Sequence, residues 1–309
     1  EGLKEAYDKE FVLTSKGLLD VDAIPNKLVI IGGGVIGLEF ATIFNSFGTE
    51  VTIIEREKNI LLNVDDEVRD AMMKVLKKSK VNILTEATVT KIADNGVCFK
   101  KEDKEDTIQA DRVLLSVGMQ ANTNGIESLD LDMENHFVKI NDHMQTSKDT
   151  IYAIGDINGK MMLAHVASHQ GIIAINHILG KSETMDYMQV PSAVYSFPEI
   201  AQIGYTEKML KENEMDYKAS TFPLQANGKA LSANATEGFI KILADPKYNE
   251  ILGVHIMADN ASDLISEAVM TMKLEGTADE IAHAIHPHPT TSEIFNEAAW
   301  GIVDKPIHI

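Results

Sequence analysis

Residues 27–40 read KLVIIGGGVIGLEF, a short apolar run followed by three consecutive glycines and a second apolar stretch. The first five of these residues predict a buried parallel strand, because such strands are apolar on both faces. From Val35 to Phe47 apolar residues recur at helical spacing, and Gly48 is placed to end the helix. A second strand is predicted over residues 50–55, EVTIIE. Together these elements form a βαβ unit whose crossover helix opens directly on the glycine loop.

The glycines of this loop stand in the G-x-G-x-x-G register of dinucleotide-binding folds, at Gly32, Gly34 and Gly37. The first permits a tight turn, the second lets a pyrophosphate approach backbone N–H groups, and the third lets the helix pack on the strand. A carboxylate at the end of the second strand, Glu55, can accept hydrogen bonds from an adenosine ribose and repels a 2′-phosphate. The pattern therefore favours NAD over NADP, although the adjacent Arg56 weakens that preference slightly. A glycine turn without a ligand stays open as an alternative.

The composition is that of a globular protein, with 309 residues, 44% hydrophobic and 24% charged, and the length fits two domains or one domain plus a substantial appendage. The net charge of −19, from 28 basic and 47 acidic residues, argues against nucleic acid and anionic membranes as partners. The longest apolar runs are interrupted by glycine and fall short of a membrane span of about 20 residues. A single cysteine, Cys98, excludes an internal disulfide and a cysteine-based metal cluster, and scarce cysteine fits a cytoplasmic location. No signal peptide opens the chain and Glu1 is not an initiator methionine, which indicates a processed product or a fragment.

The remaining sequence predicts the rest of the α/β part and then a distinct α+β part that begins near residue 188. Asp65 is expected to cap a helix that runs to Lys78. Strand-like segments follow at residues 81–84, 87–92, 96–100, 107–110, 111–118 and 150–156, and the three from 96 to 118 look antiparallel rather than parallel. A long helix is predicted from Leu163 to Leu179. In the second part, residues 238–259 predict a hairpin that turns at DPKYNE, followed by helical stretches at 262–274, 277–285 and 290–301.

Near the end of the chain the stretch IHPHPTTSE, residues 285–293, holds His286 and His288, each followed by proline, and a carboxylate at Glu293. Taken alone, these histidines are consistent with ordinary loop residues, or with a His-x-His metal pair for which Glu293 is the nearest third ligand. The stretch TIYAIGD, residues 150–156, is likewise consistent with a plain turn when taken alone.

Five stretches, spread in order over nearly all 309 residues, together resemble the flavoprotein disulfide reductases, and most closely the dihydrolipoyl dehydrogenase branch of that family. They are KLVIIGGGVIGLEFA, EVTIIE, LLSVGMQANT, TIYAIGDINGKMMLAHVASHQG and HPHPTTSEIFNEA. The resemblance implies an α/β fold in which a three-layer, Rossmann-like dinucleotide-binding domain is inserted in a partial FAD domain, with a C-terminal α+β dimerisation domain. The implied ranges are 1–22 and 146–187 for the FAD-domain segments, 23–145 for the NAD-binding domain and 188–309 for the dimerisation domain.

The same resemblance implies which residues bind the cofactors. Asp156 would hold ribityl or ribose hydroxyls of FAD, and the stretch from Met162 to His165 would line the flavin ring. Gly118 and Val89 match positions that touch NAD, and Glu39 matches an acid beside the nicotinamide. The complete expected cofactor set is Gly32, Gly34, Val35, Gly37, Glu39, Glu55, Val89, Gly118, Asp156, Met162, Leu163, Ala164 and His165.

His288 is implied by the resemblance to accept the proton of the substrate thiol, and Glu293 to orient it. This chemistry suits the residues, because a thiol attacks a disulfide only as the thiolate and an imidazole accepts protons near neutral pH. A carboxylate on the far ring nitrogen fixes the tautomer and stabilises the imidazolium. The implied reaction is NAD-linked oxidation of dihydrolipoamide through FAD and a redox disulfide, in a homodimer that serves a 2-oxo acid dehydrogenase or glycine cleavage complex, with no metal. Glu55 and the His-x-His form favour this reaction over that of the glutathione-type, NADPH-linked enzymes.

Two features of the family do not occur in these 309 residues, namely a further G-x-G-x-x-G for FAD near the start and a C-x4-C redox disulfide. Cys98 cannot substitute, because one sulfur does not cycle as a disulfide. We therefore expect a C-terminal fragment with an incomplete FAD site that does not oxidise dihydrolipoamide alone. Two other functions stay open: a non-catalytic nucleotide-binding and dimerisation module, and a flavin-dependent NADH oxidase or diaphorase-like relative, which needs no C-x4-C pair.

Overall fold

The computed structural model describes residues 10–308 and divides into two compact units. Of the described residues, 10–117 and 191–308 form one unit, and 118–190 form the other. Residues 1–9, which belong to the expected FAD-domain segment 1–22, lie outside the described residues. None of the helices within residues 10–308 combines the length and the apolar composition that a membrane span requires.

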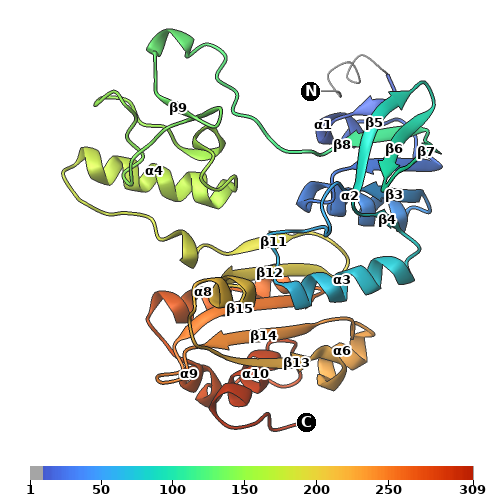
Figure 1. Cartoon of the computed structure of the whole chain (residues 1–309). Coiled ribbons are helices and arrows are strands. Elements are labelled where there is room, and N and C mark those ends of the chain that lie inside the picture. The colour runs from blue at the N-terminus through green and yellow to red at the C-terminus, as the bar shows by residue number, and fades with distance from the viewer. Residues whose placement is uncertain (1–9, 309) are drawn as a thin grey trace. The chain divides into compact units, whose positions relative to one another are not determined.

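A five-stranded parallel sheet with the order β1-β8-β2-β3-β4 forms the centre of the N-terminal part of the first unit (Figure 1). Its strands are β1 (Val12–Leu13), β2 (Lys27–Ile31), β3 (Glu50–Ile54), β4 (Asn82–Leu84) and β8 (Arg112–Leu115). The strands predicted over 27–31 and 50–55 are confirmed. The antiparallel prediction for residues 111–118 was wrong, because β8 lies between β1 and β2 and runs parallel to both. Its apolar residues are buried on both faces, as is typical of a central parallel strand.

The parallel sheet is covered by helices on one face and by a small antiparallel sheet on the other. The helices are α1 (Ser15–Leu19), α2 (Val35–Ser46) and α3 (Asp66–Lys78), and the small sheet consists of β5 (Ala87–Ala93), β6 (Gly96–Lys101) and β7 (Lys104–Gln109). Successive side chains of β2 alternate between the two layers: Leu28 and Ile30 pack with the helices, whereas Val29 and Ile31 pack with the small sheet. The expected three-layer α/β architecture is therefore present.

The helices α2 and α3 begin and end close to the predicted positions. Asp65 is the N-cap of α3, and its side chain accepts a hydrogen bond from the backbone N–H of Glu67 at 3.2 Å. Helix α2 ends at Ser46, and Gly48 follows in the left-handed region at φ +89°.

The C-terminal part of the first unit is an antiparallel sheet with the order β11-β12-β15-β14-β13, packed against helices. Its strands are β11 (Ser192–Val194), β12 (Glu199–Gly204), β13 (Lys218–Pro223), β14 (Phe239–Ala244) and β15 (Ile251–Ala258). Its helices are α5 (Glu207–Glu212), η5 (Leu224–Ala226), α6 (Gly228–Ala233), α7 (Ala261–Leu264), α8 (Ser266–Lys273), α9 (Ala278–His283) and α10 (Glu293–Val303). The hairpin predicted over 238–259 is confirmed as β14 and β15. The helix predicted over 262–274 is divided in two at Ile265.

A buried ionic cluster joins α3 to the antiparallel sheet within this first unit. The ammonium nitrogen of Lys241, on β14, lies 3.0 Å from Asp65 Oδ1, 3.1 Å from Glu67 Oε2 and 2.6 Å from Glu207 Oε2. The side chains of Lys241 and Asp65 are each only 1% exposed. The N-cap residue of α3 is therefore also the anchor that fixes this helix to the second sheet.

The second unit, residues 118–190, is built around helix α4 (Ala164–Ile178). Its other elements are β9 (Met133–Glu134), β10 (Phe137–Val138) and the 3-10 turns η2 (Glu127–Leu129), η3 (Gly155–Asn158) and η4 (Tyr187–Gln189). The helix predicted over 163–179 is confirmed. The strand predicted over 150–156 was wrong, because among the described residues its only strand-like pairing is a bridge between Gln145 and Tyr152. The backbone N–H of Gly155 donates instead to the Gln170 side chain at 2.7 Å, and the chain turns into η3.

Candidate active site

A pocket of about 440 Å³ lies where β2, β3 and β8 end, beside the start of β5. Four of the residues predicted from the sequence line it, namely Gly32, Gly34, Glu55 and Val89. The other residues of its wall are Ile31, Ile54, Arg56, Ala87, Thr88, Ser116 and Val117. The carboxyl ends of parallel strands are the usual position of a nucleotide site in such folds.

The glycine turn has the geometry that its spacing predicts. Gly32 has φ +108°, and a Cβ there would lie 2.4 Å from the backbone oxygen of Ser116. A Cβ on Gly37 would lie 2.1 Å from the carbonyl oxygen of Gly32, so helix α2 packs on the turn only with glycine. At Gly34, by contrast, none of residues 10–308 other than Gly34 and its two chain neighbours places a heavy atom within 4 Å of the Cβ position. The backbone at Gly34, which is the N-cap of α2, is therefore open to a pyrophosphate group.

Glu55 is held at the wall of the pocket by two backbone hydrogen bonds. Its Oε2 accepts from the N–H of Gly33 at 2.7 Å, and its Oε1 accepts from the N–H of Glu57 at 2.8 Å. The neighbouring Arg56 pairs with Glu57 at 3.0 Å. A fixed carboxylate in this position suits a ribose diol, whose two hydroxyl groups are hydrogen-bond donors.

The remaining expected nucleotide residues lie on α2 or outside this pocket wall. Val35 is the exposed first residue of α2. Glu39, one turn further along, accepts a hydrogen bond from the backbone N–H of Tyr195 at 2.9 Å. Gly118 is the first residue of the second unit, where it has φ +119°.

The residues expected to touch FAD all belong to the second unit. Asp156 is exposed in η3, and Met162 is 42% exposed just before α4. Leu163 is the N-cap of α4, and Ala164 and His165 are its first two residues, both exposed. An exposed carboxylate followed by this exposed segment gives a ligand both polar and apolar groups to contact.

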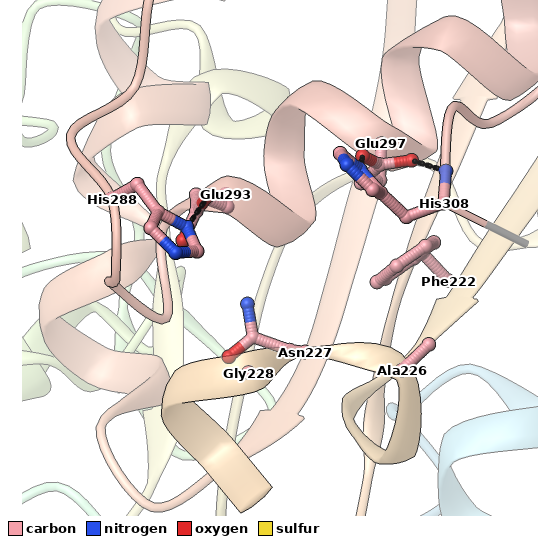
Figure 2. Close-up of a pocket in the computed structure, with 8 residues that line it drawn as sticks. All are labelled: Phe222, Ala226, Asn227, Gly228, His288, Glu293, Glu297 and His308. Atoms are coloured by element: carbon pink, nitrogen blue, oxygen red, sulfur yellow. Dashed lines mark hydrogen bonds and ion pairs between the residues drawn. The ribbon is translucent and has the colours of Figure 1, made fainter. Parts of the chain in front are cut away.

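The His288 ring and the Glu293 carboxylate form a hydrogen-bonded pair, as Figure 2 shows. His288 Nδ1 lies 2.9 Å from Glu293 Oε1, so the proton on Nδ1 is donated to the carboxylate and Nε2 is left as the acceptor. The second carboxylate oxygen of Glu293 accepts from the backbone N–H of Thr290 at 2.8 Å. Partial burial opposes ionisation of Glu293, but the Thr290 N–H and the His288 ring hold the pKa of its carboxyl below the usual range.

His286 has a carboxylate partner of its own. Its Nε2 lies 2.7 Å from Glu267 Oε1 on α8, and this hydrogen bond raises the pKa of the His286 imidazole above its ordinary value. The two histidines of the His-x-His stretch are thus directed to different carboxylates. This arrangement does not support the metal-pair alternative, which requires both rings to face one ion.

His288 and Glu293 line a second pocket, of about 120 Å³, together with residues that the sequence did not single out. These are Phe222, Ala226, Asn227, Gly228, Glu297 and His308 (Figure 2). The Asn227 side chain donates to the carbonyl of Thr290 at 3.0 Å and so fixes the loop that carries His288. One signal for Glu297 was available in the sequence, because it follows Glu293 by four residues on a predicted helix.

Two family models match the chain. The model described as pyridine nucleotide-disulphide oxidoreductase matches residues 1–171, and the model for the dimerisation domain of the same family matches residues 190–299.

Several characterised proteins are similar to the chain over most of its length. Dihydrolipoyl dehydrogenase of Bacillus subtilis (strain 168) is 41% identical over 310 residues, which cover 97% of this chain and 65% of that protein. Dihydrolipoyl dehydrogenase 2, mitochondrial, of Arabidopsis thaliana is 36% identical, covering 98% of this chain and 61% of that protein. The chain thus spans 61% to 65% of the length of these relatives.

Solved structures also share the fold of the chain. LpdA from Mycobacterium tuberculosis aligns with a TM-score of 0.86 and 26% identity, covering 94% of this chain and 64% of that chain. The HOCl-induced flavoprotein disulfide reductase RclA from Escherichia coli aligns with a TM-score of 0.86 and 27% identity, covering 94% of this chain and 68% of that chain.

Proposed function

The chain belongs to the pyridine nucleotide-disulphide oxidoreductase family, and from that premise we propose that it provides the NAD-binding and thiol-deprotonating parts of a dihydrolipoyl dehydrogenase. The observation that carries the proposal is the 2.9 Å hydrogen bond between His288 and Glu293, whose geometry leaves Nε2 of the ring free to accept a proton. The similarity to dihydrolipoyl dehydrogenases supports a dithiol as the source of that proton.

In the proposed mechanism His288 takes the proton of a substrate thiol on Nε2. The resulting imidazolium is stabilised by Glu293, which stays in place because Thr290 N–H and His288 both donate to it. The thiolate that forms is the nucleophilic species for attack on a disulfide. Asp156 and the segment from Met162 to His165 would hold FAD, which would supply electron transfer between the dithiol–disulfide centre and the nicotinamide.

For the pyridine nucleotide, we propose that Gly34 lies under the pyrophosphate and that Glu55 binds the adenosine ribose, which selects NAD. Val35, Val89 and Gly118 would contact the same nucleotide, and Glu39 would lie beside the nicotinamide. For the flavin, Asp156 would bind hydroxyl groups of the sugar chain, and the segment from Met162 to His165 would contact the ring. The open backbone at Gly34 and the exposed Asp156 support these roles.

The family's dimerisation domain over residues 190–299 supports a homodimer. We propose that this dimer serves a 2-oxo acid dehydrogenase or glycine cleavage complex in the cytoplasm. We also propose that these 309 residues alone do not oxidise dihydrolipoamide, because they contain one cysteine, Cys98, and a single sulfur does not cycle as a disulfide. The kinetic tests therefore use a holoenzyme that contains this chain, bound flavin and the cysteine pair of the redox disulfide.

The test is NADH formation from dihydrolipoamide by that holoenzyme with His288→Gln. Loss of the general base is expected to lower kcat/KM by about 10²- to 10⁴-fold. His283→Gln is the matched control, because His283 is an exposed histidine that does not line the pocket and contacts the backbone of its own helix. Wild-type rates in His288→Gln would overturn the proposal.

The NADH oxidase alternative makes a different prediction in the same assay. Oxygen-dependent consumption of NADH that is insensitive to His288→Gln, with no turnover of dihydrolipoamide, would favour that alternative.

A further inference from the structure

A second imidazole–carboxylate pair lines the same pocket as His288 and Glu293. Glu297 follows Glu293 by one helical turn on α10, and its Oε1 lies 2.5 Å from His308 Nδ1. The two pairs share one pattern: the His288 and His308 side chains are 76% and 72% exposed, whereas those of Glu293 and Glu297 are 24% and 7% exposed. Figure 2 shows both rings at the pocket, with Asn227 and Gly228 on the facing wall.

The contacts of Glu297 fix the chain segment that carries His308. Besides the imidazole, the carboxylate of Glu297 accepts hydrogen bonds from the backbone N–H groups of Ile307 at 2.7 Å and of His308 at 3.2 Å. A buried carboxylate requires such donors, so the segment is bound to α10 at the pocket. Since Nδ1 of His308 is engaged by Glu297, Nε2 is the ring nitrogen left for a ligand.

The charges around the His308 ring favour its protonated form. Its hydrogen bond with Glu297 raises the pKa of the His308 imidazole above its ordinary value. The charged or titratable residues that line the pocket with it are Glu293, Glu297 and His288, and the opposite wall, from Phe222 to Gly228, carries no charge. The carboxylate of Glu297 therefore favours the imidazolium form of His308 in this pocket.

We propose that His308 is a further catalytic residue, whose imidazolium, held by Glu297, stabilises the substrate thiolate that His288 generates. This inference rests on the proposed function of His288 as the base. In the step itself the S–H bond breaks, its proton bonds to Nε2 of His288, and the electron pair stays on sulfur, so no redox change occurs. The negative sulfur then faces the Nε2–H of His308. A positive group close to a thiol favours the thiolate in the same way that His⁺ activates a cysteine.

The kinetic test is the pH profile of kcat/KM for dihydrolipoamide in the holoenzyme with His308→Gln. An opposite charge within about 4–6 Å shifts a thiol pKa by at least about 1 unit, so loss of the imidazolium is expected to lower kcat/KM about 10-fold at low pH. The ratio of wild type to variant should fall toward 1 as the pH rises through the pKa of His308, because the wild-type ring is then neutral as well. His308→Lys, which keeps a positive charge, should restore the rate at low pH, and His283→Gln should match wild type throughout.

A ratio that is the same at all pH values would overturn the inference, because it would show that His308 only holds the C-terminal segment in place. That result would leave the proposed function intact as long as His288→Gln is inactive. A wild-type rate in His288→Gln would instead overturn the proposed function, and the inference with it.

A binding measurement on the 309-residue chain gives a readout that does not depend on turnover. Dihydrolipoamide is titrated into the chain while the ring signals of His288 and His308 are followed by NMR, with assignments from the two glutamine variants. We expect both signals to move together with one dissociation constant. Movement of the His288 signal alone would overturn the inference. If neither signal moves, the proposal that this pocket binds the dithiol is overturned as well.

Discussion

Replacement of Lys241 by methionine removes the buried cation of the cluster that joins α3 to the antiparallel sheet and leaves Glu207 with the exposed Lys211 at 3.7 Å. The change leaves Asp65, which is 1% exposed, and Glu207, whose side chain is 27% exposed, without their ammonium partner at 3.0 and 2.6 Å. Removal of one member of a buried ion pair costs about 3–5 kcal/mol, because the remaining charge is buried without compensation. Glu67 adds little to this cost, since half of its side chain is exposed. We therefore expect Lys241→Met to lower the free energy of unfolding by about 3–5 kcal/mol.

Urea unfolding followed by the fluorescence of Trp300 measures this cost. Trp300 is the single tryptophan of the chain and lies on α10, which packs on the same sheet as Lys241. Lys78→Met is the matched control, because Lys78 also joins α3 to the region of β14, through Glu237, but is 75% exposed. An exposed pair of this kind contributes less than about 1 kcal/mol. The reasoning is refuted if Lys241→Met is no less stable than Lys78→Met.

Neutralisation of Asp65 should recover part of the free energy of unfolding that Lys241→Met loses. Asparagine is a good N-cap, so Lys241→Met with Asp65→Asn keeps the start of α3 and removes the orphaned charge. The double variant is expected to be more stable than the sum of the two single changes predicts. Strict additivity would show that the two side chains do not act as a pair.

The cluster also has a defined pH dependence. Burial opposes ionisation of Asp65, but His255 and Lys241 hold the pKa of its carboxyl below the usual range. Burial also opposes ionisation of Glu207, and its hydrogen bond with Lys241 lowers the pKa of that carboxyl. Such groups stabilise the fold above their unfolded pKa values of about 4, and this contribution is lost as the pH falls through the folded values. Burial favours the neutral amine of Lys241, but its hydrogen bonds to Glu207 and Asp65 raise the pKa of the ammonium, so its contribution is complete below about pH 10. The stability difference between wild type and Lys241→Met should be largest between neutral pH and about pH 10 and should shrink as the pH falls, because burial without the ammonium favours the protonated form of Asp65 in the variant.

Three further predictions concern the glycine turn and two residues that hold the segment around His288. Gly37→Ala places a Cβ 2.1 Å from the carbonyl oxygen of Gly32, so it should displace α2 from the turn and weaken NADH binding by about 10-fold or more in a calorimetric titration, and unchanged affinity would contradict the geometry of the turn. The hydrogen bond with Glu267 raises the pKa of the His286 imidazole, so this pair stabilises the fold fully below about pH 6.5 and loses that effect as the pH rises through the folded pKa. The free energy of unfolding of His286→Gln should therefore differ from that of wild type more at pH 6 than at pH 9. A difference that does not change with pH would contradict the pairing. Asn227→Ala removes both the N-cap of α6 and a hydrogen bond to the loop that carries His288, so we expect a loss of about 1–2 kcal/mol in urea unfolding, which wild-type stability would contradict.

Local signals predicted the strands β2 and β3 and the helices α2 and α3 well. The glycine spacing, the apolar run over 27–31 and the cap at Asp65 each determine structure within a few residues of the chain, and the structure places all three as expected. The pairing of His288 with Glu293 also spans only five residues, within one loop and the first turn of a helix.

The errors arose where structure depends on distant partners. Whether β8 runs parallel is decided by its neighbours β1 and β2, and the segment 150–156 is not a strand because Gln170 and the following turn take up its backbone groups. Lys241 looked like one polar residue in an apolar strand, since its partner Asp65 lies 176 residues earlier. His308 is held at the second pocket by its contact with Glu297. No local sequence pattern predicts this contact.

The central prediction is that NAD binds in the pocket at the glycine turn. The measurement is calorimetric titration of the 309-residue chain with NADH and, separately, with NADPH. Glu55, fixed by the N–H groups of Gly33 and Glu57, predicts that NADH binds at least about 10-fold more tightly, because the carboxylate accepts from the ribose hydroxyls and repels a 2′-phosphate. Equal or tighter binding of NADPH, or no binding of either nucleotide, would contradict the account.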